Sequence, residues 1–161
     1  MTGAPLLLAL ASVLVVTSVV DLRERRIPDA CVLAILFLRL AGLVLAHDLS
    51  RGLPTLALVR SLAAGLVVGG FLLAFALATR RLLHAPGMGG GDLKLLASLA
   101  CHLGVEGGLA LVALSCLLAL SSVLVMRLPR FRPGSSAGSL LQQDFAWAPA
   151  ISVSALLLLL R

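Results

Sequence analysis

Six apolar segments run through this chain of 161 residues, and polar connections separate them. A helix needs about 20 apolar residues to cross a bilayer, and most of the segments approach that length. The shortest segment, 93–104, is expected to cross only partly or to continue a tilted element with its glycine-rich lead-in. We expect an all-α, polytopic membrane helix bundle of about six transmembrane segments, forming one domain over 1–161. The apolar segments are 4–20, 30–46, 56–79, 93–104, 107–126 and 145–160.

The composition excludes a soluble domain. Hydrophobic residues make up 60% of the chain and charged residues only 12%, about half of the roughly 25% that soluble domains carry. The pI near 11 raises the question of nucleic acid binding. However, the basic residues cluster between apolar segments, and the chain has no Tyr and one Trp. We therefore expect the lipid bilayer, and no nucleic acid, as a partner.

The connections differ in charge, and this predicts their sidedness. Nine of the 13 basic residues lie in the first, third and fifth connections, and the positive-inside rule places those connections in the cytoplasm. Both termini are then expected outside. The nine residues are Arg23, Arg25, Arg26, Arg80, Arg81, Lys94, Arg127, Arg130 and Arg132.

Two aspartates mark the borders of apolar segments. Asp21 ends the first apolar run, and Asp92 opens a later one directly after a glycine-rich stretch. Carboxylates at membrane depth are costly and usually functional. The predicted topology places both at the cytoplasmic face, so one fold could bring them together. Two adjacent carboxylates that share a proton can activate a water molecule.

Each aspartate also has a simpler interpretation. Asp21 could belong to an ordinary cytoplasmic loop, and Asp92 could cap a membrane helix. The glycines before Asp92 favour a functional role, because they let the backbone turn tightly and bring the carboxylate close to another segment.

The stretch Gly89-Gly90-Gly91-Asp92 matches a known motif. It resembles the G-x-G-D motif of the prepilin peptidase family, intramembrane aspartyl proteases, and Lys94 and Leu95 extend the match. The resemblance implies that Asp92 is catalytic and that Gly89, Gly91 and Lys94 support it.

The segment from Asp21 to Ile27 and Pro28 is similar to the first-aspartate motif of the same family. This implies that Asp21 is the second catalytic carboxylate and that Ile27 and Pro28 are supporting residues. The family usually has Asn where this chain has Asp29. Residues 145–150 look like a diverged form of the family's proline-rich start to the last helix.

The resemblance also implies an activity. The family removes the short basic leader from type IV pilin-like precursors, including Flp/Tad pilins and pseudopilins, at the cytoplasmic face of the bacterial inner membrane. Expected partners are the precursor's leader and helix, with no cofactor and no metal. Longer members carry cysteine pairs associated with N-methylation. This chain begins at its first helix without such a pair, so it resembles the short, peptidase-only form.

Other residues are expected to have no catalytic role, and Asp29 and Asp144 among them are expected to cap helices. Cys31, Cys101 and Cys116 lack the spacing of a metal or redox motif and are expected to pack as small apolar groups. Gly65 and Gly69 are expected to let helices approach closely. Arg39 could snorkel to the interface or face the bundle, and its partner stays open.

Two questions remain open from sequence. A non-catalytic component of a pilus or secretion assembly, or a small proton-coupled transporter, is the alternative function. Paired membrane acids also serve proton relays, but a relay needs acids deep within helices, whereas Asp21 and Asp92 lie at one face. The second question is which aspartate acts as base, because the pair titrates as a unit.

Overall fold

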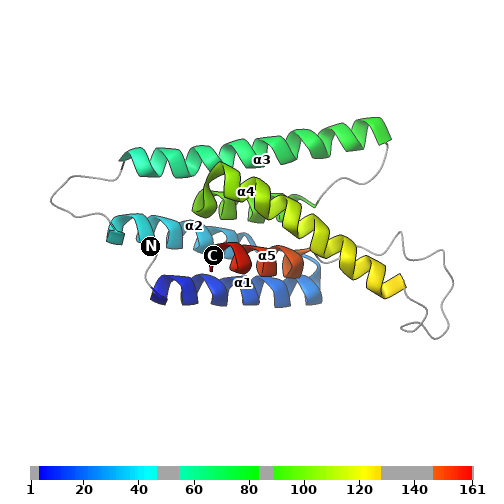
Figure 1. Ribbon diagram of the computed structural model, residues 1–161, viewed down its shortest axis with the longest axis horizontal. Coiled ribbons are helices and arrows are strands. Elements are labelled where there is room, and N and C mark those ends of the chain that lie inside the picture. Colours follow the sequence, from blue (N-terminus) through cyan, green and yellow to red (C-terminus); the bar gives the residue numbers. More distant parts are fainter. Residues whose placement is uncertain (1–3, 47–54, 84–88, 128–146, 161) are drawn as a thin grey trace.

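The computed structural model describes residues 4–46, 55–83, 89–127 and 147–160, and most of these are helical (Figure 1). No strand occurs among the described residues, so the predicted all-α class is confirmed. The helices are α1 (Ala4–Glu24), α2 (Asp29–Ala46), α3 (Thr55–Leu83), α4 (Gly90–Arg127) and α5 (Ala148–Leu159).

Helix α4 reverses its direction at Gly104. This residue has φ 79° and ψ −179°, a backbone conformation that glycine adopts without strain. A Cβ built on Gly108 would lie 2.8 Å from the Cβ of Ala100, although a continuous helix would separate these residues by about 12 Å. The label α4 therefore covers two antiparallel arms, a first arm (90–103) and a second arm (105–127), as Figure 1 shows.

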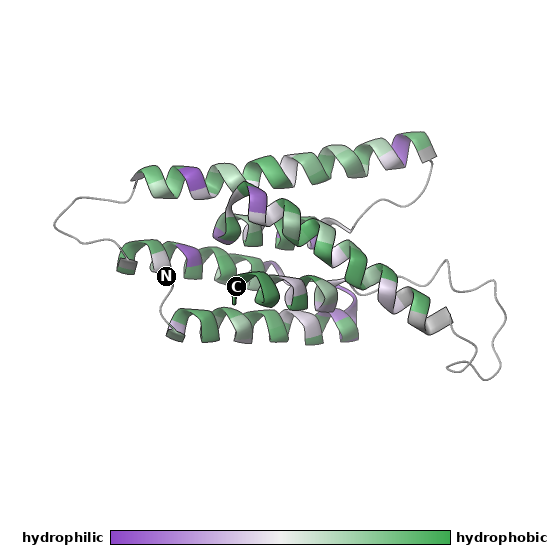
Figure 2. Ribbon diagram, in the orientation of Figure 1, coloured by the Kyte–Doolittle hydropathy of each residue, from purple (hydrophilic) through white to green (hydrophobic). Residues whose placement is uncertain are grey.

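The lengths of the helices bear on how they sit in a bilayer. By length and composition, Ala4–Glu24, Thr55–Leu82 and Gly90–Ser122 are each long and apolar enough to cross, and Figure 2 shows how hydrophobic they are. The first arm of α4 alone is about 21 Å long, short of the roughly 30 Å hydrocarbon core. It corresponds to the short fourth segment of the sequence. The segment expected over 145–160 is helical from Ala148 to Leu159.

Helix α4 lies at the centre of the packing. It contacts α2, α3 and α5, and α1 closes the bundle against α2 and α5. The close approach predicted at Gly65 and Gly69 is confirmed: a Cβ on Gly65 would lie 2.9 Å from the carbonyl oxygen of Ala97, and one on Gly69 would lie 3.0 Å from the Ala97 Cβ. The glycines thus let α3 lie directly on α4.

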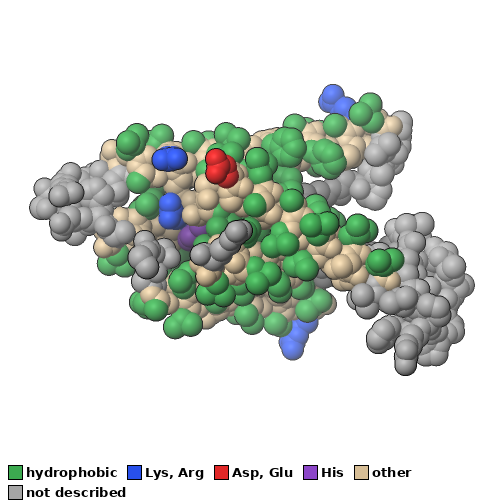
Figure 3. All heavy atoms as spheres, in the orientation of Figure 1, with side chains coloured by type: hydrophobic (Ala, Val, Ile, Leu, Met, Phe, Trp, Pro, Cys, Tyr) green, Lys and Arg blue, Asp and Glu red, His purple; other side chains and the backbone are tan. Residues whose placement is uncertain are grey.

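Apolar side chains cover the outside of the bundle as well as its core. Leu14, Ile35, Leu95 and Leu99 are fully buried. Large apolar side chains such as Phe71 also point outward, and Figure 3 shows a surface with few charged groups. This arrangement suits lipid as the surrounding solvent.

One end of the bundle gathers the residues singled out by the sequence. In Figure 1, α1 ends there, α2 and α5 begin there, and both arms of α4 have their outer ends there. Asp21 and Asp92 therefore lie at the same end.

Candidate active site

Asp21 occupies the last turn of α1, and its carboxylate is held by another helix. Its side chain is only 6% exposed. The backbone N–H of Ala148, the first residue of α5, donates a hydrogen bond to Asp21 Oδ2 at 3.1 Å. The amino end of a helix carries partial positive charge, and the Asp21 carboxylate lies against it. Pro149 follows in the first turn of α5, where the missing N–H costs no helical hydrogen bond.

Helix α1 stops just beyond Asp21. Arg25 has a left-handed backbone with φ 53°, and its N–H donates to the Asp21 carbonyl at 2.9 Å. A left-handed residue directly after a helix is a common way to end it. The chain then turns through Ile27 and Pro28 into α2, and this turn presents Ile27 to the start of α4.

Asp92 lies in the first turn of α4, over the backbone of Gly89. A Cβ on Gly89 would lie 2.9 Å from Asp92 Oδ2, closer than a side chain tolerates. The Gly89 carbonyl accepts a hydrogen bond from the N–H of Leu93 at 3.2 Å, which fixes the turn. Glycine at position 89 therefore leaves room for the Asp92 carboxylate in this position.

The structure brings the two predicted carboxylates together. The charges of Asp21 and Asp92 interact electrostatically, and both side chains are withdrawn from solvent. Two like charges in such a place do not both ionise easily, so the arrangement favours one proton held between them. Such a pair can take a proton from water with one carboxylate while the other donates a hydrogen bond.

The supporting residues connect the two aspartate segments. A Cβ on Gly91 would lie 3.1 Å from the Ile27 Cβ, so the glycine lets α4 start directly against this turn. Asp29, expected as a helix cap, is the first residue of α2, and its Oδ1 pairs with Lys94 Nζ at 2.7 Å. Asp29, which departs from the family pattern, thus contacts Lys94, which extends the G-x-G-D motif.

Comparison with known proteins assigns the family. Residues 8–124 match the model of the type IV leader peptidase family, and the matched range includes both aspartates. The chain belongs to this family.

Similarity to one characterised member of the leader peptidase family supports the assignment. The chain is 31% identical, over 148 residues, to the prepilin leader peptidase/N-methyltransferase of Neisseria gonorrhoeae. The match covers 91% of the chain and 45% of that relative, so the chain spans less than half of the relative's length. No solved structure matches the chain.

The candidate site also contains a contact that the sequence did not predict. The donor to Asp21 is the backbone of Ala148, and a backbone N–H leaves no trace in residue type. The only pointer was the proline-rich start expected for the last helix, of which Pro149 is part. Residues 145 and 146 of that stretch, and Asp144, which was expected to be a cap, lie outside the described residues.

The structure shows the hydrogen-bond partner of Arg39, which the sequence left open. Its Nε donates to the Ser61 hydroxyl at 3.0 Å, and that hydroxyl donates to the Cys101 carbonyl at 2.6 Å. Cys101 ends the first arm of α4, where helical carbonyls lose their usual partners. Arg39 lies away from the aspartates and takes no part in this site.

Proposed function

We propose that this protein is an aspartic endopeptidase that removes the short basic leader from type IV pilin-like precursors. The observation that carries the proposal is the withdrawn, electrostatically coupled pair Asp21 and Asp92, contributed by two segments that match the family's motifs. The named activity of the gonococcal relative agrees with it.

We assign different roles to the two carboxylates. We take Asp21 as the negatively charged base, because its Oδ2 accepts the Ala148 N–H and is thereby oriented as an acceptor. Asp92 holds the shared proton, because it is withdrawn from solvent beside that charge. Asp21 removes a proton from water, and the resulting hydroxide attacks the scissile carbonyl while Asp92 donates a hydrogen bond to the developing oxyanion.

Collapse of the tetrahedral intermediate completes the reaction. The C–N bond breaks, and the leaving amine takes the proton that Asp21 received from water. One peptide and one water give a carboxylic acid and an amine. The substrate must be extended at the cleavage point, since a helix keeps its carbonyls in internal hydrogen bonds. The leader connection of a pilin-like precursor, next to its membrane helix, meets this need.

The proposed site faces the cytoplasm of the bacterial inner membrane. Support comes from the basic residues in the first and third connections, next to Asp21 and Asp92. Reporter fusions at Ser136 and after Arg161 test this. A cytoplasmic signal at the first and an external signal at the second are expected. The reverse pair of signals would exclude a cytoplasmic leader as substrate.

Co-expression with candidate Flp/Tad pilin or pseudopilin precursors tests the activity. The parent protein should convert the precursor to a faster-migrating product on a gel. Asp21→Asn and Asp92→Asn keep the side-chain volume but remove the shared proton, so each should reduce cleavage to background at equal membrane abundance. If either variant cleaved the precursor nearly as well as the parent, the pair Asp21 and Asp92 would not be the catalytic site.

Asp29→Asn is the matched control. It changes a carboxylate only a few residues from the pair to the residue usual in the family. Its exposed side chain keeps an oxygen for Lys94, so we expect cleavage close to that of the parent.

We also propose that the activity stops at cleavage, without N-methylation. The described cysteines are separate free thiols on α2 and the two arms of α4, not a pair. Mass spectrometry of the product tests this: its new N-terminus should carry a free amine. A mass increase of one methyl group would overturn this part of the proposal and leave the peptidase assignment intact.

A further inference from the structure

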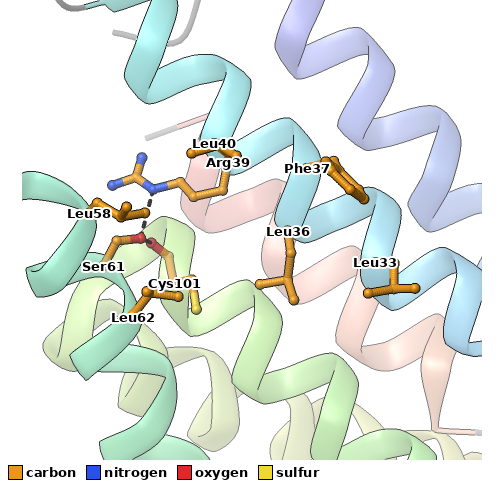
Figure 4. Close-up of a pocket in the computed structure, with 9 residues that line it drawn as sticks. All are labelled: Leu33, Leu36, Phe37, Arg39, Leu40, Leu58, Ser61, Leu62 and Cys101. Carbon is orange, nitrogen blue, oxygen red and sulfur yellow. Dashed lines mark hydrogen bonds between the residues drawn. The ribbon is translucent and has the colours of Figure 1, made fainter. Parts of the chain in front are cut away.

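A groove in the lipid-facing surface has an apolar wall and one cationic end. It encloses about 270 Å³ between α2 and α3, with Cys101 of α4 at its floor. Leu33 and Phe37 lie at one end of it, and Arg39, Leu40 and Leu58 lie at the other (Figure 4). The groove opens sideways, because α2 and α3 barely touch and both pack on α4.

The guanidinium of Arg39 is fixed in place. Its Nε donates to Ser61, whose own proton is used by the Cys101 carbonyl, so the hydroxyl is oriented as an acceptor. The guanidinium carries four further N–H groups on its two terminal nitrogens. Figure 4 shows these nitrogens turned away from Ser61 and from the apolar wall.

The position of Arg39 along α2 sets its depth in the bilayer. It lies about 15 Å along the helix from Asp29 and about 10 Å from Ala46, so it is nearer the end away from the aspartates. Arginine at such a depth reaches with its head toward the nearer interface. Figure 3 shows a second basic side chain, over α3, on the same face as the one over α2.

The geometry points to a binding site for an anionic phospholipid of the leaflet opposite the aspartate pair. The phosphodiester would accept hydrogen bonds from the terminal nitrogens of Arg39, and one acyl chain would lie along the groove toward Leu33. In a lipid of that leaflet the charged headgroup lies near the interface by Arg39, and the acyl chain runs from there toward the middle of the bilayer. Arg pairs well with phosphate because its fork of N–H groups matches two phosphate oxygens.

The apolar wall and the single cationic end select this occupant. A free anion would leave the wall exposed to solvent or detergent. A neutral chain alone would offer no acceptor to the terminal N–H groups of Arg39, and polar groups without a partner are costly in a membrane. A phospholipid satisfies both parts of the groove, and the bilayer supplies it from the open side.

The test uses the full-length protein purified in a neutral detergent. Phosphatidylglycerol, and diacylglycerol with the same acyl chains, are titrated while native mass spectrometry counts retained lipid and the unfolding midpoint is followed. Phosphatidylglycerol should be retained and should raise the midpoint, because a ligand of the folded state stabilises it. Diacylglycerol should do neither. Equal retention of the two lipids would overturn the headgroup site.

Variants distinguish the contribution of the Arg39 charge to lipid binding from that of the apolar groove. Arg39→Gln should weaken phosphatidylglycerol binding by at least about tenfold, since one charge-assisted hydrogen bond is lost. Arg80→Gln, at the other end of α3, is the control and should bind as the parent does. Unchanged binding by Arg39→Gln would overturn the proposal.

A second variant keeps the test decisive if Arg39→Gln folds poorly. Leu62→Trp leaves Arg39 in place and fills the groove from its exposed wall, so it should also prevent lipid retention. Retention at the parental level in Leu62→Trp would overturn the proposal. A photo-crosslink from position 62 to a precursor helix, with lipid retention unaffected by Arg39→Gln, would assign the groove to a protein partner instead.

Discussion

The backbone N–H of Ala148 and the carboxylate of Asp21 are joined by a buried hydrogen bond of 3.1 Å across 127 positions of sequence. This bond attaches the first turn of α5 to the last turn of α1. It gives Asp21 a fixed orientation and a partial positive charge nearby. Asp92 lies in the first turn of its own helix, α4, and its nearest described constraint is the glycine backbone at 89.

Ala148→Pro should remove this donor and reduce cleavage. Proline fits the first turn of a helix, so α5 can still form. Without the N–H, the Asp21 carboxylate is no longer held in a fixed orientation, so the variant should cleave more slowly than the parent. Cleavage of a pilin-like precursor by purified protein measures this.

Ala150→Pro is the matched control for Ala148→Pro. It removes another N–H of the same first turn, one that makes no bond to Asp21. Its rate of cleavage should match that of the parent. An equal loss in both variants would show that the effect comes from α5 itself and not from the bond to Asp21.

Gly91→Val should reduce cleavage by at least about tenfold, which corresponds to an increase of about 1.4 kcal/mol in the activation barrier. The added Cβ would meet Ile27 at 3.1 Å and move the start of α4, which carries Asp92. Gly89→Val should do the same by pushing on the Asp92 carboxylate. The processed-to-unprocessed ratio at equal membrane abundance is the measurement.

Gly90→Ala serves as the control for these glycines. A Cβ at position 90 meets nothing within 4 Å, so the variant should cleave as the parent does. If Gly90→Ala were as impaired as Gly91→Val, the loss would reflect backbone flexibility and not the contact with Ile27.

Gly65→Ala should destabilise the fold without touching the aspartates. Its Cβ would approach the Ala97 carbonyl to 2.9 Å and separate α3 from α4. Overpacking of this kind costs about 1–3 kcal/mol. Unfolding of the purified protein in detergent measures the loss, with Gly70→Ala as the control because position 70 is open. Equal stability of the two variants would contradict the close packing.

Lys94→Met should change stability by less than about 1 kcal/mol, because the ion pair with Asp29 is exposed. Its effect on cleavage should stay within about threefold. A double-mutant cycle with Asp29→Asn gives the coupling directly. A coupling well above 1 kcal/mol would mean that the pair holds the two motif segments together more firmly than its exposure suggests.

The sequence predicted the helices well and the contacts between them poorly. The first three apolar segments, 4–20, 30–46 and 56–79, correspond to α1, α2 and α3 because in lipid the backbone must satisfy its own hydrogen bonds. The short fourth segment was also recognised from its length. The reversal at Gly104 depends on one backbone conformation, and neighbouring glycines at 107 and 108 gave no means of choosing that residue.

The parts of the site that are made by side chains could be predicted from the sequence. Asp21, Asp92 and the glycines beside Asp92 were found because their chemistry is unusual in an apolar chain. The bond from Ala148 was not, because a backbone donor is the same in every residue except proline. The partner of Arg39 was missed for another reason: many hydroxyls exist in the chain, and only the packing of α2 on α3 and α4 selects Ser61.

The connection between Ala148 and Asp21 also sets an order of events during synthesis. A ribosome produces α1 first and α5 last among the described helices, so Asp21 enters the membrane well before its hydrogen-bond donor exists. Asp92 is likewise present before position 148 is made. Throughout that interval the newly made chain holds both carboxylates with one of them unrestrained. The pair can reach its final geometry only after α5 has been made and has docked on α1.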